Sequence, residues 1–85
     1  MSTITFSDES WKDYLYWQTT NKNNLKKINA LIKNIMRNPF EGMGKPEPLK
    51  YQLQGCWSRR IDQEHRLVYE VTDDSILIVS CRFHY

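Results

Sequence analysis

The spacing of apolar residues predicts one strand and one long helix in the first half of the chain. Residues 3–6, "TITF", alternate and are rich in β-branched side chains, which is typical of a short strand. From residue 22 to residue 37 the apolar residues recur at helical spacing, and Pro39 marks the end of this helix. The apolar positions of this helix are Leu25, Ile28, Leu31, Ile32, Ile35 and Met36.

Another helix is expected between these two elements. Ser7 can cap it. Asp8 and Glu9 then lie in the first turn, where the helix dipole favours acidic side chains. Its predicted apolar face consists of Trp11, Tyr14 and Leu15. Tyr16 and Trp17 lie off that face, so we expect this helix to be buried on more than one side or to carry an exposed aromatic patch.

The second half of the chain changes to a period of two. Residues 39–50 hold three prolines and two glycines, which indicates an extended loop. Four antiparallel strands are then predicted at residues 50–54, 57–61, 65–71 and 75–83. We therefore expect a single α+β domain over residues 1–85, with a short N-terminal strand and two helices packed on one face of a mainly antiparallel sheet.

Composition narrows the class of protein. A chain of 85 residues with 40% hydrophobic residues and three glycines is typical of one compact domain. No apolar stretch is long enough to span a bilayer and the N-terminus has no signal-peptide pattern, so we expect a cytoplasmic protein without membrane contact. Cys56, Cys81, His65 and His84 lack metal-ligand spacing, and no metal or cofactor is expected.

The long helix carries charge of one sign. No acidic residue occurs from residue 14 to residue 40, although basic residues recur there. A basic stripe opposite the apolar face consists of Lys22, Lys26, Lys33 and Arg37. Such a stripe is often only a solvated surface, but like charges one helical turn apart repel each other, and an anionic partner would relieve the repulsion. We expect the stripe to serve docking on such a partner.

The predicted strands and the loop before them carry groups suited to binding and cleaving RNA. The cations are Lys45, Lys50, Arg59, Arg60, Arg66 and Arg82. The candidate RNA or phosphate ligands among them are Lys45, Lys50, Arg59 and Arg60. No serine or cysteine has an adjacent base that marks it as a nucleophile, and no glycine-rich phosphate loop is present.

One reaction fits these groups without a metal. The 2′-OH of RNA is an internal nucleophile, so cleavage needs a base, an acid for the leaving 5′-oxygen, and cations around the phosphorane. Glu47 is the candidate base, His84 the candidate acid, and Arg66 or Arg60 the phosphate ligand. The terminal aromatics can stack on a splayed base. Each residue also has an ordinary interpretation, as a solvated carboxylate, an exposed strand residue or a frayed end.

The stretches "ESWKDYLYW", "RNPFEGMGKPEPL", "CWSRRI", "EHRLVYEV" and "CRFHY" closely resemble the YoeB toxins of the RelE-type toxin–antitoxin superfamily. The resemblance covers nearly the whole chain. It implies a ribosome-dependent mRNA endonuclease with a microbial RNase-like fold that cuts the codon in the ribosomal A site. It also implies Glu47 as general base, Arg66 as transition-state ligand and His84 as general acid, with Tyr85 orienting the substrate. Supporting phosphate contacts are implied at Lys50 and Arg60.

The resemblance implies partners as well. A small YefM-like antitoxin is expected to wrap the toxin and block or distort its terminal residues, and operator DNA is expected to be bound only through that complex. The ribosome and its A-site mRNA are the other expected partners, and a homodimer is possible within the family. Two other hypotheses stay open, namely a non-catalytic RNA- or ribosome-binding module and a protein-interaction domain that uses exposed Tyr16 and Trp17.

The sequence leaves one geometric question open. If the last two predicted strands pair in plain register, Arg66 lies on the face of Cys81 and Phe83, and not on that of His84. A bulge, an odd-length turn or an early exit from the last strand would change this.

Overall fold

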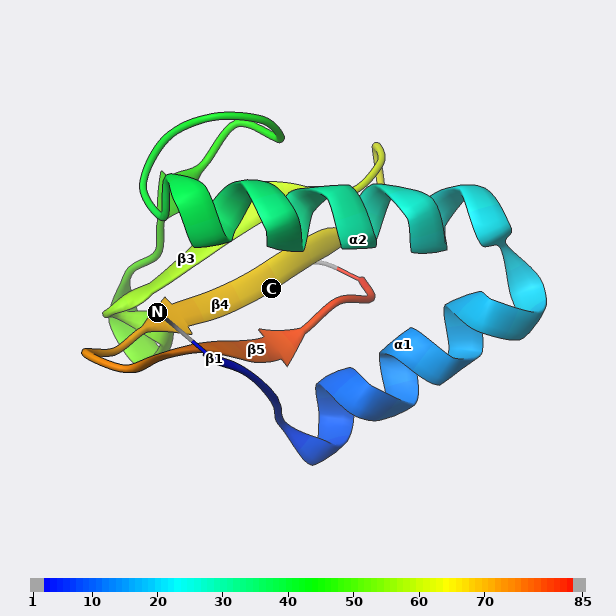
Figure 1. Cartoon of the computed structure of the whole chain (residues 1–85), viewed down its shortest axis with the longest axis horizontal. Helices are drawn as coiled ribbons and strands as arrows, with labels where there is room; N and C mark the ends of the chain where they lie inside the picture. The colour runs from blue at the N-terminus through cyan, green and yellow to red at the C-terminus, as the bar shows by residue number, and fades with distance from the viewer. Residues whose placement is uncertain (1–2, 84–85) are drawn as a thin grey trace.

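The computed structural model describes residues 3–83 as a five-stranded sheet with two helices on one face (Figure 1). In chain order the elements are β1 (Thr3–Phe6), α1 (Asp8–Thr20), α2 (Lys22–Arg37), β2 (Glu47–Pro48), the 3₁₀ helix η1 (Tyr51–Leu53), β3 (Cys56–Arg60), β4 (Arg66–Val71) and β5 (Ser75–Ser80). The strand order is β1-β5-β4-β3-β2. β1 runs parallel to β5 and the other neighbours are antiparallel, which confirms the predicted fold class. No helix in this part of the chain is long and apolar enough to cross a bilayer.

α2 has the predicted bounds and packs its apolar face on the sheet. Its fully buried apolar side chains are Ile28, Leu31 and Ile35, which join the main core with Leu67, Tyr69 and Ile78 of the sheet. Met36 was expected on the same face but is 41% exposed. Each residue turns the helix by about 100°, so Met36, one position after Ile35, lies at the side of the buried face. Its assignment to the core is corrected.

α1 starts after the predicted cap but buries a different face. The Ser7 side chain accepts a hydrogen bond from the backbone N–H of Ser10. Trp17 is only 4% exposed, whereas Trp11 and Leu15, which were expected to face the core, are 47% and 42% exposed. Trp17 can be buried because its indole Nε1 donates to a backbone carbonyl at 2.8 Å, which satisfies its polar group.

Of the two alternatives expected for α1, burial on more than one side is correct for Tyr16 and Trp17, which form no exposed patch. Trp17 belongs to the main core, and Tyr16 is half-buried beneath the guanidinium of Arg82, whose Cζ lies 3.6 Å from the ring centroid. This burial contradicts the hypothesis of a protein-interaction domain that uses exposed Tyr16 and Trp17, so that hypothesis is wrong.

The segment between α2 and β3 also differs from the prediction. Residues 50–54 form no strand, because Tyr51 has a φ of 59° and begins the helix η1. A short strand forms earlier instead, where β2 pairs with β3 inside the expected loop. Leu49 then packs with Cys56 and Val68 in a small second core on the sheet face away from the helices.

The pairing of β4 with β5 contains a bulge. Tyr69 pairs with Ile78, but Val68 pairs with Ser80, so Val79 is an extra residue. One extra residue reverses the alternation of faces beyond that point. β5 then ends at Ser80, three residues before the predicted end. Because of the bulge and the early end of β5, the residues after Ser80 do not follow the plain register that would set their face relative to Arg66.

Candidate active site

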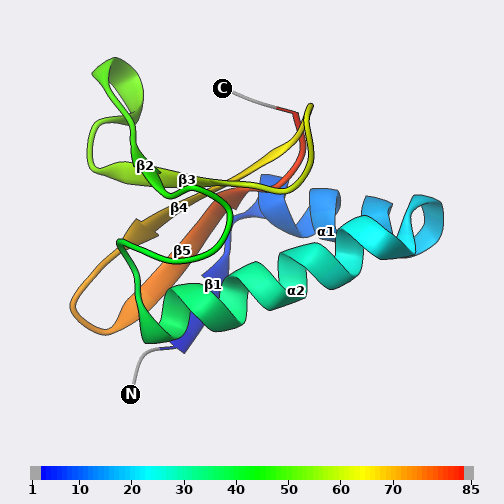
Figure 2. The ribbon, with the colours of Figure 1, turned by 90° about the horizontal axis from the view of Figure 1, so that it is seen from above.

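Three of the expected cleavage residues, Glu47, Arg60 and Arg66, lie on one face of the sheet. It is the face opposite the helices, called the open face below, and the two sides of the sheet can be followed in Figure 2. Glu47 pairs with Ser58 across β2 and β3, and Arg60 pairs with Arg66 across β3 and β4. Directly paired residues, and residues two apart on one strand, point to the same face. Val68 pairs with Ser58 and belongs to the small core away from the helices. Glu47, Ser58, Arg60 and Arg66 therefore share the open face.

Glu47 lies at the edge of this face in a fixed backbone. It is exposed and stands between two prolines, whose rings restrict the chain on both sides. Glu47 and Lys50 both line a surface hollow beside η1. The expected base and one expected phosphate ligand are thus brought together.

Arg66 and Arg60 form a like-charged pair across two strands. Arg66 is half-buried and its Nη1 donates to Ser58 Oγ at 3.3 Å, while Arg60 is exposed. Like charges directly opposite each other in a sheet are destabilising, and a bound anion would offset that cost. Ser58 was not predicted as a residue of this site. The register that places it between Glu47 and Arg66 has no signature in the sequence.

Arg59 points the other way, into the core. It is 0% exposed and donates to the side chain of Asn34, to Tyr69 Oη and to three backbone carbonyls. Its guanidinium is therefore not available to RNA. The expected phosphate contact at Arg59 is corrected to a structural role.

Lys45 lies beside a separate hollow at the edge of the sheet. This hollow is lined by Lys27, Lys45 and Arg60 among others, so Arg60 connects it to the open face. Lys27 was not among the expected ligands, because it lies off the basic stripe. The Asp62 carboxylate also lines this hollow, but the three cations outnumber it, so the edge is positive and suits an anionic chain.

The basic stripe of α2 lies apart from the open face. Its four cations are all exposed, and α2 covers the opposite face of the sheet (Figure 2). The structure thus separates the stripe from Glu47 and Arg66. Docking through the stripe stays a prediction.

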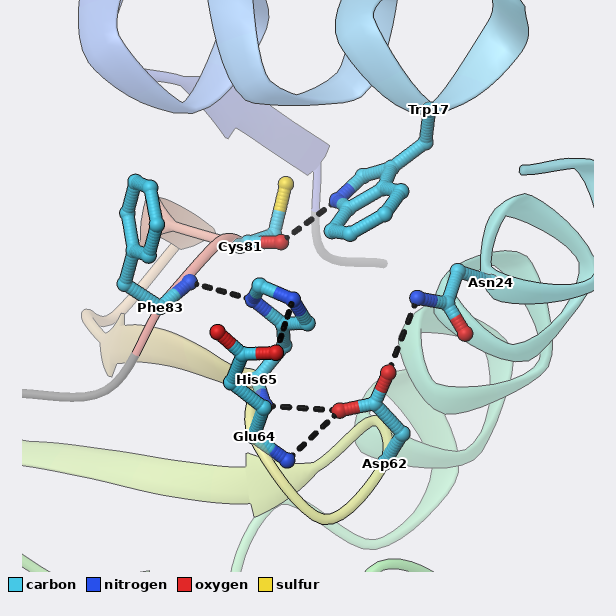
Figure 3. Close-up of polar contacts among 7 residues, drawn as sticks. All are labelled: Trp17, Asn24, Asp62, Glu64, His65, Cys81 and Phe83. Carbon is cyan, nitrogen blue, oxygen red and sulfur yellow. Dashed lines mark hydrogen bonds and ion pairs between the residues drawn. The ribbon is translucent and has the colours of Figure 1, made fainter. Parts of the chain in front are cut away.

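The chain that leads to the two terminal residues is held at several backbone atoms (Figure 3). Trp17 Nε1 donates to the Cys81 carbonyl at 2.8 Å, and the Cys81 N–H donates to the Asp13 carboxylate at 3.0 Å. The Phe83 N–H donates to Nδ1 of His65 at 2.7 Å. The predicted acid His84 and the predicted stacking residue Tyr85 lie outside the described residues.

Neither cysteine is a nucleophile at neutral pH. Burial, followed by the nearby Asp13 carboxylate, raises the pKa of Cys81 to about 12. Burial and the Glu70 carboxylate also raise the pKa of Cys56. Because the thiolate is the reactive form, both thiols stay inert. Within residues 3–83, no three His, Cys, Asp or Glu side chains are grouped so that they could hold a metal.

Known proteins similar to this chain show its family. Residues 6–85 match the family described as the YoeB-like toxin of bacterial type II toxin–antitoxin systems. Toxin YoeB of Escherichia coli strain K12 is 67% identical over 82 residues, which cover 96% of this chain and 98% of that protein.

Solved structures share the fold over nearly the same length. A YoeB dimer from Staphylococcus aureus has a TM-score of 0.93 at 54% identity and covers 99% of this chain and 98% of its own. A YoeB–YefM complex from the same organism has a TM-score of 0.91 at 55% identity and covers 100% of this chain and 99% of its own.

Proposed function

The chain belongs to the YoeB-like toxins of bacterial type II toxin–antitoxin systems, and we propose that it is an endoribonuclease that cuts mRNA in the ribosomal A site and so inhibits translation. The observation that carries the proposal is the open face, where Glu47 shares a surface with the facing cations Arg60 and Arg66. A carboxylate near two guanidinium groups supplies the base and the charge stabilisation that metal-independent RNA cleavage needs.

In the proposed reaction the RNA supplies the nucleophile. Glu47 accepts the proton of the 2′-OH, and the oxygen attacks the adjacent phosphorus. The bond to the 5′-oxygen breaks, His84 gives that oxygen a proton, and a 2′,3′-cyclic phosphate remains. Arg66 and Arg60 offset the negative charge of the phosphorane, and Tyr85 stacks on or orients the base.

The proposed partners follow from the family. The YoeB–YefM complex and the YoeB dimer from Staphylococcus aureus support a YefM-like antitoxin and a homodimer as assemblies of this chain. Operator DNA is then contacted only through the antitoxin complex. The basic stripe is proposed to dock on the ribosome, because its four exposed cations lie away from the open face.

Replacing Glu47 by glutamine tests the assigned base. The amide keeps the size and hydrogen-bonding capacity of the side chain but cannot accept the proton, so cleavage should slow by about 10²–10⁴-fold. Single-turnover primer extension on a ribosome-bound reporter mRNA measures the rate. Glu41→Gln, at another exposed carboxylate of the same loop, should keep the wild-type rate.

Three outcomes would contradict the proposal or part of it. If the wild-type protein binds ribosomes but the transcripts stay intact, the chain is a binding module and not a nuclease. If free mRNA is cut as fast as ribosome-bound mRNA, cleavage does not depend on the ribosome. A loss below about tenfold for Glu47→Gln would show that Glu47 is not the base.

A further inference from the structure

His65, in the turn between β3 and β4, contacts the chain end and has no part in the proposed chemistry (Figure 3). A backbone N–H can only donate, so the bond of 2.7 Å from Phe83 makes Nδ1 the unprotonated nitrogen of the ring. The hydrogen of the neutral ring is then on Nε2, which lies 3.5 Å from a carboxylate oxygen of Glu64. His65 is 9% exposed, and both its nitrogens are engaged.

His65 is itself fixed by both helices. The Asp62 carboxylate accepts from the His65 backbone N–H at 2.7 Å, and its other oxygen accepts from the Asn24 side chain of α2 at 3.0 Å. Burial opposes the ionisation of Asp62, but the hydrogen bonds from Asn24 and from the backbone outweigh it and lower its pKa. The ring of His65 meets Trp17 of α1 edge to face, with centroids 4.8 Å apart.

The chain end needs such support because its backbone is strained. Phe83 has a φ of 62°, in the left-handed region that residues other than glycine seldom adopt. Two hydrogen bonds hold this conformation, since the Phe83 N–H donates to His65 and its carbonyl accepts from the Arg66 N–H at 2.9 Å. Strained backbone persists only where its surroundings over-determine it, and this is often at functional sites.

We propose that His65 is a positioning residue, whose Nδ1 fixes the backbone of Phe83 and thereby sets the place from which His84 and Tyr85 extend. The inference rests on the proposed function, in which His84 is the acid. Consecutive Cα atoms are about 3.8 Å apart, so a shift of Phe83 is passed directly to the next residue. A general acid must lie within hydrogen-bond reach of the leaving oxygen, and a misplacement of about 1 Å can cost roughly 10²-fold in rate.

Two substitutions separate the acceptor from the bulk of the ring. His65→Leu keeps much of the bulk of the side chain but removes the acceptor, and we expect single-turnover cleavage to slow by about 10²-fold with unchanged ribosome affinity. His65→Asn keeps an oxygen near the place of Nδ1, and its loss should stay below about tenfold. Gln63→Leu, a polar-to-leucine change at an exposed position of the same turn, should keep the wild-type rate. Urea unfolding of each variant identifies those that are folded.

The bond itself is measured without reference to activity. In uniformly ¹⁵N-labelled wild-type protein, a scalar coupling across the hydrogen bond should join the Phe83 amide to His65 Nδ1, and the His65 nitrogen shifts should show the Nε2–H tautomer. Both signals should persist in Gln63→Leu. Their absence from the wild-type protein would overturn the proposal, even if His65→Leu failed to fold.

The outcomes distinguish this inference from the proposed function. Wild-type protein that leaves ribosome-bound mRNA intact refutes the proposed function. Wild-type protein that cuts, together with a folded His65→Leu variant that cuts equally fast, refutes only the role of His65. A loss in His65→Leu that is restored in His65→Asn supports positioning through the acceptor.

Discussion

Arg59 is a buried cation whose charge is balanced by oxygen dipoles. Two of its acceptors, the Asn34 side chain and the Asn38 carbonyl, belong to the last turn and cap of α2, where the helix dipole favours a positive charge. Two others, the carbonyls of Glu41 and Met43, belong to the loop that leads to β2. Arg59 therefore ties the loop that carries the proposed base to the end of the long helix.

Replacing Arg59 by lysine is expected to lower the free energy of unfolding by roughly 3 kcal/mol. A single ammonium cannot reach acceptors spread around a planar guanidinium, so buried oxygens lose their donors. Urea unfolding followed by tryptophan fluorescence measures the change. Arg60→Lys, at the exposed neighbour, is the matched control and should stay within about 0.5 kcal/mol of wild type. Equal losses in the two variants would contradict the structural role of Arg59.

The alternation of β3 already contained the signal that separates these two arginines. Trp57 and Ile61 are apolar, and a residue midway between them in a strand points to the same face, which is the face of the core. That position is Arg59. Arg59 was nevertheless predicted to be a surface cation, because charged residues are seldom fully buried.

Among the elements, the strongly periodic ones were predictable and the short ones were not. α2 has the bounds that were expected, because its apolar spacing is regular and Pro39 follows its end. The Asn21 side chain, which caps its start, was not used in that prediction. β2 has only two residues and contains a proline, so no sequence pattern marks it. The alternation of residues 50–54 wrongly indicated a strand, since period two says nothing of the left-handed turn at Tyr51.

The basic stripe of α2 is the element-scale prediction that ribosome binding tests. Reversing Lys26 and Lys33 to glutamate together should weaken ribosome binding and reduce its dependence on salt, by roughly one unit of slope for each lost phosphate contact. Sedimentation with ribosomes at several salt concentrations measures both. The fold should survive, because both side chains are exposed.

A charge reversal elsewhere controls for the net charge. Lys12→Glu lies on an exposed position of α1, outside the stripe, and should change ribosome affinity much less than the double variant. Ribosome affinity that is the same for the double variant and the wild type would rule out docking through the stripe.

For the whole molecule, buried acids predict a loss of stability in alkali. The folded protein keeps the Cys81 thiol protonated up to a pKa of about 12, whereas the ordinary value is 9.0. Between these values the unfolded chain has lost a proton that the folded chain retains, so the stabilisation is complete below pH 9 and declines as the pH rises toward 12. In this range the titration of Cys81 alone lowers the free energy of unfolding by about 1 kcal/mol per pH unit. Burial of Tyr69, only partly offset by Arg59, raises its pKa and acts in the same direction.

Urea unfolding from pH 8 to pH 11 measures this decline. Cys81→Ala removes the titrating group, so its free energy of unfolding should fall less steeply with pH, although the small cavity lowers it at every pH. Parallel curves for the wild type and the variant would show that Cys81 does not titrate in this way.

The assembly of the site was only partly predictable. The residue types selected Glu47, Arg60 and Arg66 as candidate chemistry, and strand pairing brings them to one face. Their register depends on β2, and the course of the chain after Ser80 depends on the extra residue at Val79; neither feature has a sequence signature. His65 was equally unmarked, because its position depends on a turn and a chain end that meet only in the folded molecule.

The parallel pairing of β1 with β5 has a consequence for synthesis. β1 is the first strand to be translated, and its partner begins only at Ser75 of 85 residues. Closing a loop of that length is slow compared with forming local hairpins, and translation at about 5–20 residues per second adds several seconds of waiting. The sheet cannot be completed until residues 75–78 have been translated. A nascent chain that is released before β5 has been translated therefore lacks the partner of β1 and the centre of the sheet.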